Sequence, residues 1–141
     1  MISEEDIQKV VRAFYIDVRQ DDLLAPVFAT KINDDDWDRH MDHIADFWSS
    51  IFLKTGRFKG NPMIKHAAIP DITPEHFQRW LSLFHQTARR LLEPEKAEIF
   101  DTMARRIATS LQMGLAFNFE KLGRQDHPFK DYGLRRSHAA R

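Results

Sequence analysis

GNPMIKHAAIPDITPEHFQRWLSLF, residues 60–84, places His66 on a short segment between two proline-marked breaks. Thr73 followed by Pro74 is typical of a helix N-cap with proline at the first helical position. Apolar residues then recur at helical spacing along one face: Phe77, Trp80, Leu81, Phe84, Ala88, Leu91 and Leu92. The stretch therefore predicts a lone imidazole on a short turn, directly before a long aromatic helix.

The same helical spacing continues on both sides of this stretch. A capping pattern at Ser3 begins a helix that fades near Gln20, and the acidic cluster 34–36 begins another that ends near Gly56. The last helix begins at Pro94 and carries an apolar stripe of Ile99, Met103, Ile107, Leu111 and Leu115. No segment shows the sustained alternation of a strand, so the sequence predicts an all-α fold.

Composition limits the classes of protein and partner. With 141 residues the chain suits about one domain, and its eleven Phe and three Trp suggest that something broad and flat needs an aromatic lining. The absence of cysteine excludes disulfides, thiolate zinc sites and thiol catalysis. The 21 basic residues balance the 21 acidic ones, so no overall field attracts nucleic acid or an anionic membrane.

The two ends of the chain lack strong structural signals. The N-terminus MISEEDIQKV has no apolar signal-peptide core, and no apolar run approaches the roughly 20 residues of a membrane span, so we expect a cytoplasmic protein. Residues 121–141 form a basic tail without periodicity, expected to be a surface or frayed segment outside a domain of residues 1–120. A solvated end is the favoured interpretation, and contact with an acidic partner is the alternative.

Single histidine and aromatic side chains carry little information about function by themselves. His40 falls inside the apolar arc of its helix and is expected to face the core, whereas His43 lies at the margin. A satisfied core histidine is the default interpretation of His40, and packing is the default role of Tyr15 and Trp80. His40 and His43 form an HxxH pair but point in different directions, which disfavours a hydrolytic metal site.

The combination of these residues favours a haem site. A neutral imidazole on a short turn beside an aromatic helix is the arrangement that one axial ligand of haem iron requires. The preceding helix presents His40, Ile44 and Trp48 on one face, as the other wall of a slot. The paired Glu-x-x-His pattern of di-iron bundles, Gly-rich phosphate loops and Ser or Cys nucleophile motifs are missing. Wheel positions do not fix distances, so a haem site and ordinary core packing both stay open at this point.

Four linked stretches of the sequence resemble the truncated haemoglobins, most closely their group III. They are AFYIDVRQDDLLAPVF (13–28), WDRHMDHIADFW (37–48), GNPMIKHAAIP (60–70) and HFQRWLSLF (76–84), and the resemblance extends over roughly residues 5–120. It implies a globin-like, two-over-two helical sandwich around one b-type haem, with the iron-binding histidine on a short helical turn.

The resemblance also implies roles for individual residues. His66 corresponds to the proximal iron ligand, and Tyr15 and Trp80 correspond to hydrogen-bond donors of the distal pocket. His40 corresponds to a distal histidine that gates this pocket. The residues expected around the haem are Phe14, Phe28 and Ile44 from the resemblance, Trp48 from the helical wheel, and Lys65 and Arg57 as charge-based candidates for the propionates.

The function implied by the resemblance is binding of O₂, NO or CO at a five-coordinate iron, with distal hydrogen bonds that slow release. Slow release suits chemistry on the gas better than bulk transport. NO dioxygenation or peroxide reduction with a separate reductase is therefore the enzymatic alternative. A haem-free helical interaction domain is the third possibility, and the chain is expected to be a monomer or a weak homodimer.

Overall fold

The computed structural model describes residues 1–69 and 71–132. Every regular element in these ranges is helical, which confirms the all-α prediction. The elements are α1 (Glu4–Gln20), α2 (Ala25–Ala29), α3 (Trp37–Leu53), α4 (Pro62–Ala67), α5 (Pro74–Leu91) and α6 (Pro94–Lys121), with 3₁₀ turns at Asp34–Asp36 and Lys130–Tyr132. None of these described helices has the length and apolar character needed to cross a membrane.

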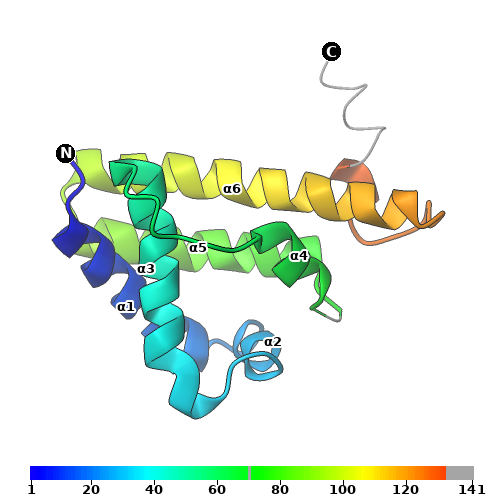
Figure 1. The fold of residues 1–141 in the computed structure, drawn as a ribbon, viewed down its shortest axis with the longest axis horizontal. Coiled ribbons are helices and arrows are strands. Elements are labelled where there is room, and N and C mark those ends of the chain that lie inside the picture. Colours follow the sequence, from blue (N-terminus) through cyan, green and yellow to red (C-terminus); the bar gives the residue numbers. More distant parts are fainter. Residues whose placement is uncertain (70, 133–141) are drawn as a thin grey trace.

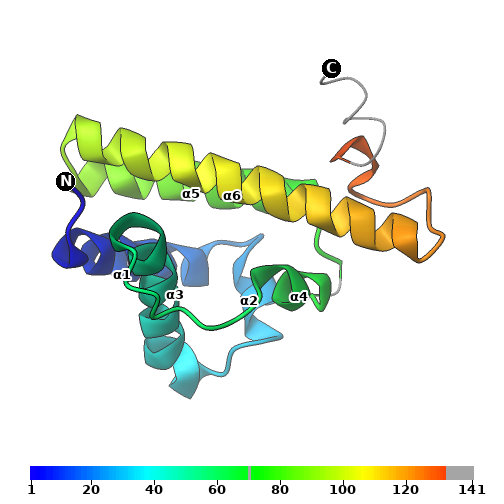
Figure 2. The ribbon, with the colours of Figure 1, turned by 45° about the horizontal axis from the view of Figure 1, so that its top comes forward.

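The long helices form two layers. Figure 2 shows α5 and α6 as one layer, with α1 and α3 packed beneath it. In Figure 1 the axis of α3 crosses those of α5 and α6, and the short α4 follows a loop that leads away from the end of α3. Contacts join α1 to both α3 and α5, and join α4 to α6. The two-over-two sandwich expected from the resemblance is therefore confirmed.

Local sequence signals determine where the long helices begin. At α1, Ser3 Oγ accepts a hydrogen bond from the Asp6 N–H at 3.1 Å, and the Asp6 carboxylate accepts one from the Ser3 N–H at 3.0 Å. This is the capping box that the sequence predicts. Lys96, at the start of α6, binds Asp6 at 2.9 Å, so the cap also joins the two layers. At α5, the Thr73 N–H donates to His76 Nδ1 at 3.0 Å, and a proline occupies the first helical position.

The end of α3 differs from the prediction. The helix stops at Leu53, before the predicted Gly56, because Lys54 adopts a left-handed φ of 57° at the C-cap. Gly56 lies in the following loop with a φ of 70°. The sequence therefore correctly predicts a left-handed residue after α3, but the first residue with that conformation is Lys54 and not Gly56.

Aromatic rings fill much of the space between the layers. Trp80, Phe84, Trp48 and Phe52 stack in a row, with successive ring centroids 5.3, 5.2 and 5.5 Å apart and an interplanar angle of 19° at each step. Phe100 of α6 packs against Phe52 at 4.9 Å and against Trp48 at 5.5 Å. The row joins α5, α3 and α6, so a large part of the aromatic content serves the core.

The basic tail is described only as far as residue 132. His127 and Phe129 are 5% and 0% exposed, whereas residues 121–126, 128, 130 and 131 are exposed. Two packed side chains therefore lie within a segment that is otherwise largely on the surface. Two buried anchors suffice to fix such a segment, and they leave no periodic pattern in the sequence. Residues 133–141, which hold His138 and half of the basic residues of the tail, lie outside the described part of the chain.

Candidate functional site

The predicted iron ligand lies near the end of α4, a helix of six residues. His66 Nδ1 is 2.7 Å from the carbonyl oxygen of Pro62. A carbonyl can only accept a hydrogen bond, so Nδ1 carries the hydrogen and donates it. Nε2 is then the nitrogen with a free lone pair, which is the form of imidazole that binds a metal.

The environment of His66 keeps its ring neutral. Burial lowers the pKa of His66, and the hydrogen bond to the Pro62 carbonyl opposes this shift in part. The ring of Phe77, in the first turn of α5, lies 6.0 Å from the imidazole at an interplanar angle of 31°. The residues around His66 therefore orient a neutral imidazole whose Nε2 is available to iron.

A second group of side chains gathers around Tyr15, and we call it the distal cluster: Phe14, Tyr15, Phe28, Trp37, His40 and Trp80. The Tyr15 ring lies 4.9 Å from Phe14, 5.7 Å from Phe28 and 5.5 Å from His40. Trp80 reaches the cluster through Phe14, with ring centroids 5.6 Å apart. The structure thus brings together five of the predicted site residues, which come from α1, α2, α3 and α5.

The Tyr15 hydroxyl is held as a neutral phenol. Burial raises the pKa of Tyr15 well above its usual value, and a hydrogen bond from Trp80 opposes this shift. An indole N–H can only donate, so the Tyr15 oxygen is the acceptor in this pair. The hydroxyl hydrogen of Tyr15 is therefore left to donate to a further group.

His40 has a buried nitrogen that calls for a partner. Burial, and to a smaller extent the nearby His43, lower the pKa of His40 to about 4, so its ring is neutral. Nε2 of His40 is buried, and no group in the described part of the chain hydrogen-bonds to it. Buried polar atoms without a partner are rare in proteins, and one at a predicted ligand site fits a pocket built for an added group. Together with the tautomer of His66, this atom indicates that the residues present fit a haem.

The remaining predicted site residues lie at different depths. Trp48 is 2% exposed and stacks in the core between Phe84 and Phe52. Ile44 is half-buried and packs against the same core. Lys65 lies exposed on α4.

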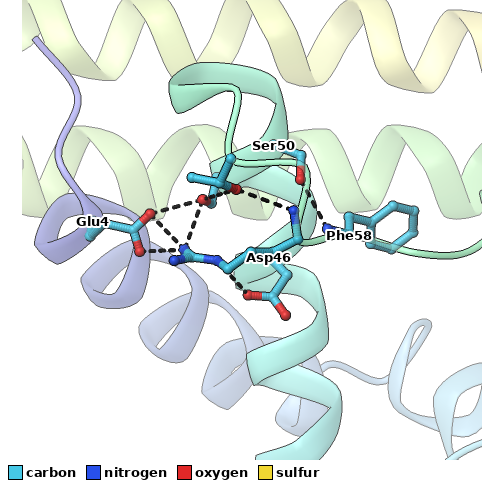
Figure 3. A network of polar contacts seen from close by, with 7 residues as sticks. Glu4, Asp46, Ser50 and Phe58 are labelled. Atoms are coloured by element: carbon cyan, nitrogen blue, oxygen red, sulfur yellow. Dashed lines mark hydrogen bonds and ion pairs between the residues drawn. The ribbon is translucent and has the colours of Figure 1, made fainter.

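Arg57 is engaged elsewhere. Figure 3 shows Glu4, Asp46, Ser50 and Phe58 in a polar network that joins the start of α1 to α3 and the loop that follows α3, and Arg57 belongs to this network. Its guanidinium donates to Glu4 at 2.7 Å and to Ser49 Oγ at 2.8 Å, and lies 3.3 Å from the Asp46 carboxylate. The hydrogen bond from Arg57 is the largest cause of the lowered pKa of Glu4. We therefore assign Arg57 to the loop and not to a haem propionate.

Sequence reasoning missed two residues of the site. Trp37 belongs to the distal cluster, with its ring 5.9 Å from Tyr15 and 5.5 Å from His40. Its position three residues before His40 places the two on the same side of the helix, which was a usable signal. Phe77 was read only as part of an apolar stripe, and no pattern in the sequence indicates that it faces His66.

Comparisons with known proteins agree with this geometry. A family model described as bacterial-like globin matches residues 3–113. A group 3 truncated haemoglobin from Campylobacter jejuni is 33% identical over 113 residues, which cover 79% of this chain and 89% of that protein. The crystal structure of a group III truncated haemoglobin from Campylobacter jejuni matches with a TM-score of 0.78 and 32% identity, over 82% of this chain and 92% of that one. Sequence, fold and the two histidine environments thus lead to one conclusion: the chain belongs to the group III truncated haemoglobins, a family of haem globins.

Proposed function

We propose that the protein binds one haem b through His66 and takes up O₂, NO or CO at the open position of its iron. The observation that carries the proposal is the 2.7 Å hydrogen bond between His66 Nδ1 and the Pro62 carbonyl. This bond fixes the tautomer, orients the ring and increases the basicity of Nε2, as carbonyl partners do for metal-binding histidines. When bound, the haem supplies an iron with a position for a diatomic gas.

The distal cluster supplies the polar groups for this gas. Tyr15 is a buried phenol whose hydroxyl hydrogen is left to donate, because its oxygen accepts from Trp80. His40 is a neutral imidazole with a buried Nε2. Donors in a buried site stabilise negative charge more than they do in water, so they favour retention of O₂ over that of CO.

Reaction of the retained gas is a second candidate function. The observation that favours it is the buried phenol of Tyr15, which is 5% exposed and packed against Phe14 and Phe28, and a donor held in this way would slow release of the gas. Nitric oxide and O₂ would combine with one electron from a reductant to give nitrate, so this activity requires a reductase as partner. Consumption of NO by the reduced, oxygenated protein, followed with an NO electrode, tests the candidate.

Haemin titration tests the first proposal. Wild type is expected to develop a Soret band that saturates at one haemin per chain, and His66→Ala is expected to lose it or weaken it strongly. His85→Gln is the matched control, because His85 lies half-exposed on α5 beside Asp101 and glutamine keeps a donor there. An undiminished band in His66→Ala would rule out His66 as the ligand. Wild type that takes up no haemin would favour the haem-free interaction domain.

A further inference from the structure

We propose that residues 123–132, here called the clasp, position the imidazole of His66 through Phe129 and Phe77. The inference rests on the proposed function, because it concerns the orientation of the proposed iron ligand. The match to the family model ends at residue 113 and does not extend over the clasp. Its role has to be read from its contacts.

The clasp folds back on the end of α6. Gly123 has a φ of 82°, a conformation that favours glycine, and its N–H donates to the Glu120 carbonyl at 3.0 Å. The Arg124 N–H donates to the Phe119 carbonyl at 3.0 Å, and the guanidinium carbon of Arg124 lies 4.7 Å from the centre of the Phe119 ring. These contacts reverse the chain and keep the next residues against α6.

His127 anchors the clasp. Its side chain is 0% exposed and stacks on Phe119, with centroids 5.0 Å apart and an interplanar angle of 11°. Nδ1 accepts a hydrogen bond from the Phe129 N–H at 3.1 Å, so Nε2 carries the hydrogen and donates to the Glu120 carboxylate at 3.0 Å. Both ring nitrogens are satisfied, and the backbone of Phe129 is fixed by one of them.

Phe129 connects the clasp to His66 through Phe77. Its ring is 0% exposed and meets Phe77 edge-on, with centroids 5.9 Å apart and an interplanar angle of 80°. Phe77 in turn lies 6.0 Å from the His66 imidazole. Because a helix of six residues has little stability of its own, the position of α4 depends on what packs against it. Loss of the Phe129 ring would remove a packing contact of Phe77 and allow the Phe77 side chain to move. The His66 imidazole could then rotate, because only its hydrogen bond to the Pro62 carbonyl would still orient it.

The experiment compares haemin-loaded, full-length Phe129→Ala and Phe129→Leu with wild type. One readout is the iron–imidazole stretching band in the resonance Raman spectrum of the reduced, gas-free protein, and the other is the rate of haemin loss to excess apomyoglobin. We expect Phe129→Ala to shift or broaden the band and to lose haemin about 10-fold faster. Phe129→Leu, which keeps apolar volume, is expected to lie between the two. Phe117→Ala is the matched control, because this phenylalanine of α6 is 67% exposed, and it should match wild type.

His127→Ala tests the anchor while Phe129 is retained, and we expect the same changes at smaller size. If Phe129→Ala does not fold, His127→Ala and Phe129→Leu still test the proposal. A merely structural role would lower the melting temperature of these variants while the Raman band and the haemin loss stay at wild-type values, and that result would overturn the clasp. Wild type that takes up no haemin would instead overturn the proposed function, and the clasp with it, so the two failures are distinguishable.

Discussion

The distal cluster and the helix α4, which carries the proposed iron ligand, hold their histidines in different ways. The distal His40 lies among the rings of Tyr15, Phe28 and Trp37, at centroid distances of 5.5, 6.2 and 5.5 Å. His66, the proposed iron ligand, is held by one backbone hydrogen bond and by the ring of Phe77. The distal cluster is thus part of the hydrophobic core, whereas the environment of His66 depends on how a short helix packs. Substitutions in the core should therefore lower the stability of the fold, and substitutions beside α4 should change the orientation of His66.

The largest expected effect is a loss of stability when the aromatic core beside the distal cluster is disrupted. Trp48→Ala removes the ring stacked between Phe84 and Phe52 and should reduce the free energy of unfolding by about 3–5 kcal/mol. Urea denaturation followed by far-UV circular dichroism measures this loss. Phe117→Ala, at an exposed position of α6, should cost far less. Equal stabilities of the two variants would show that the aromatic row does not support the fold.

A smaller effect is expected from the distal donors, without loss of the fold. Tyr15→Phe removes the hydroxyl but keeps the ring contacts, so O₂ release should accelerate by roughly 10–100-fold, the worth of a hydrogen bond to a charge-bearing acceptor. Trp80→Phe should accelerate it less, because the Trp80 indole acts on the Tyr15 hydroxyl, whose pKa it lowers. Stopped-flow displacement of O₂ by CO gives both rates. Unaltered release in both variants would refute the distal assignment.

The pH dependence of stability tests whether His40 is buried in its neutral form within the distal cluster. His40 has a pKa of about 4 in the folded chain against 6.5 when unperturbed, so the unfolded chain binds more protons between these pH values. Stability should therefore fall as the pH falls from about 6.5 towards 4. The pKa of His66 is also lowered, which adds a loss of the same sign. His40→Leu should reduce the slope of the urea midpoint between pH 7 and pH 5 in haem-free protein. An unchanged slope would contradict the buried, neutral state of His40.

The smallest effect is expected at the Arg57 network, which belongs neither to the distal cluster nor to the surroundings of His66. Arg57→Met removes the bonds to Glu4 and Asp46, but the Arg57 and Glu4 side chains are about half-exposed, and exposed ion pairs contribute little. We expect a small fall in melting temperature and wild-type release of O₂. Arg105→Met, at an exposed ion pair on α6, is the control. A clear change in haemin affinity in Arg57→Met would place this residue at a propionate after all.

The parts of the fold that depend on local signals were predictable from the sequence. Ser3 marks the start of α1 as its N-cap, Pro74 marks the start of α5 as its first residue, and the helical stripes give the layers. Gathering of the distal residues followed from the resemblance, since side chains from four helices meet only after folding. The clasp was not predictable, because His127 and Phe129 are anchored by contacts to α6 and α5 that leave no period in the sequence. The network of Arg57 was missed for a similar reason, since Glu4 lies far away in the chain.

Chemical rescue of the proximal site tests the assignment of His66 most directly. His66→Gly, titrated with haemin in the presence and absence of imidazole, separates loss of a ligand from loss of the fold. We expect His66→Gly to bind haemin weakly and millimolar imidazole to restore a Soret band and a ferrous, gas-free spectrum like those of wild type. A wild-type band in His66→Gly without imidazole would contradict the assignment and show that another side chain binds the iron.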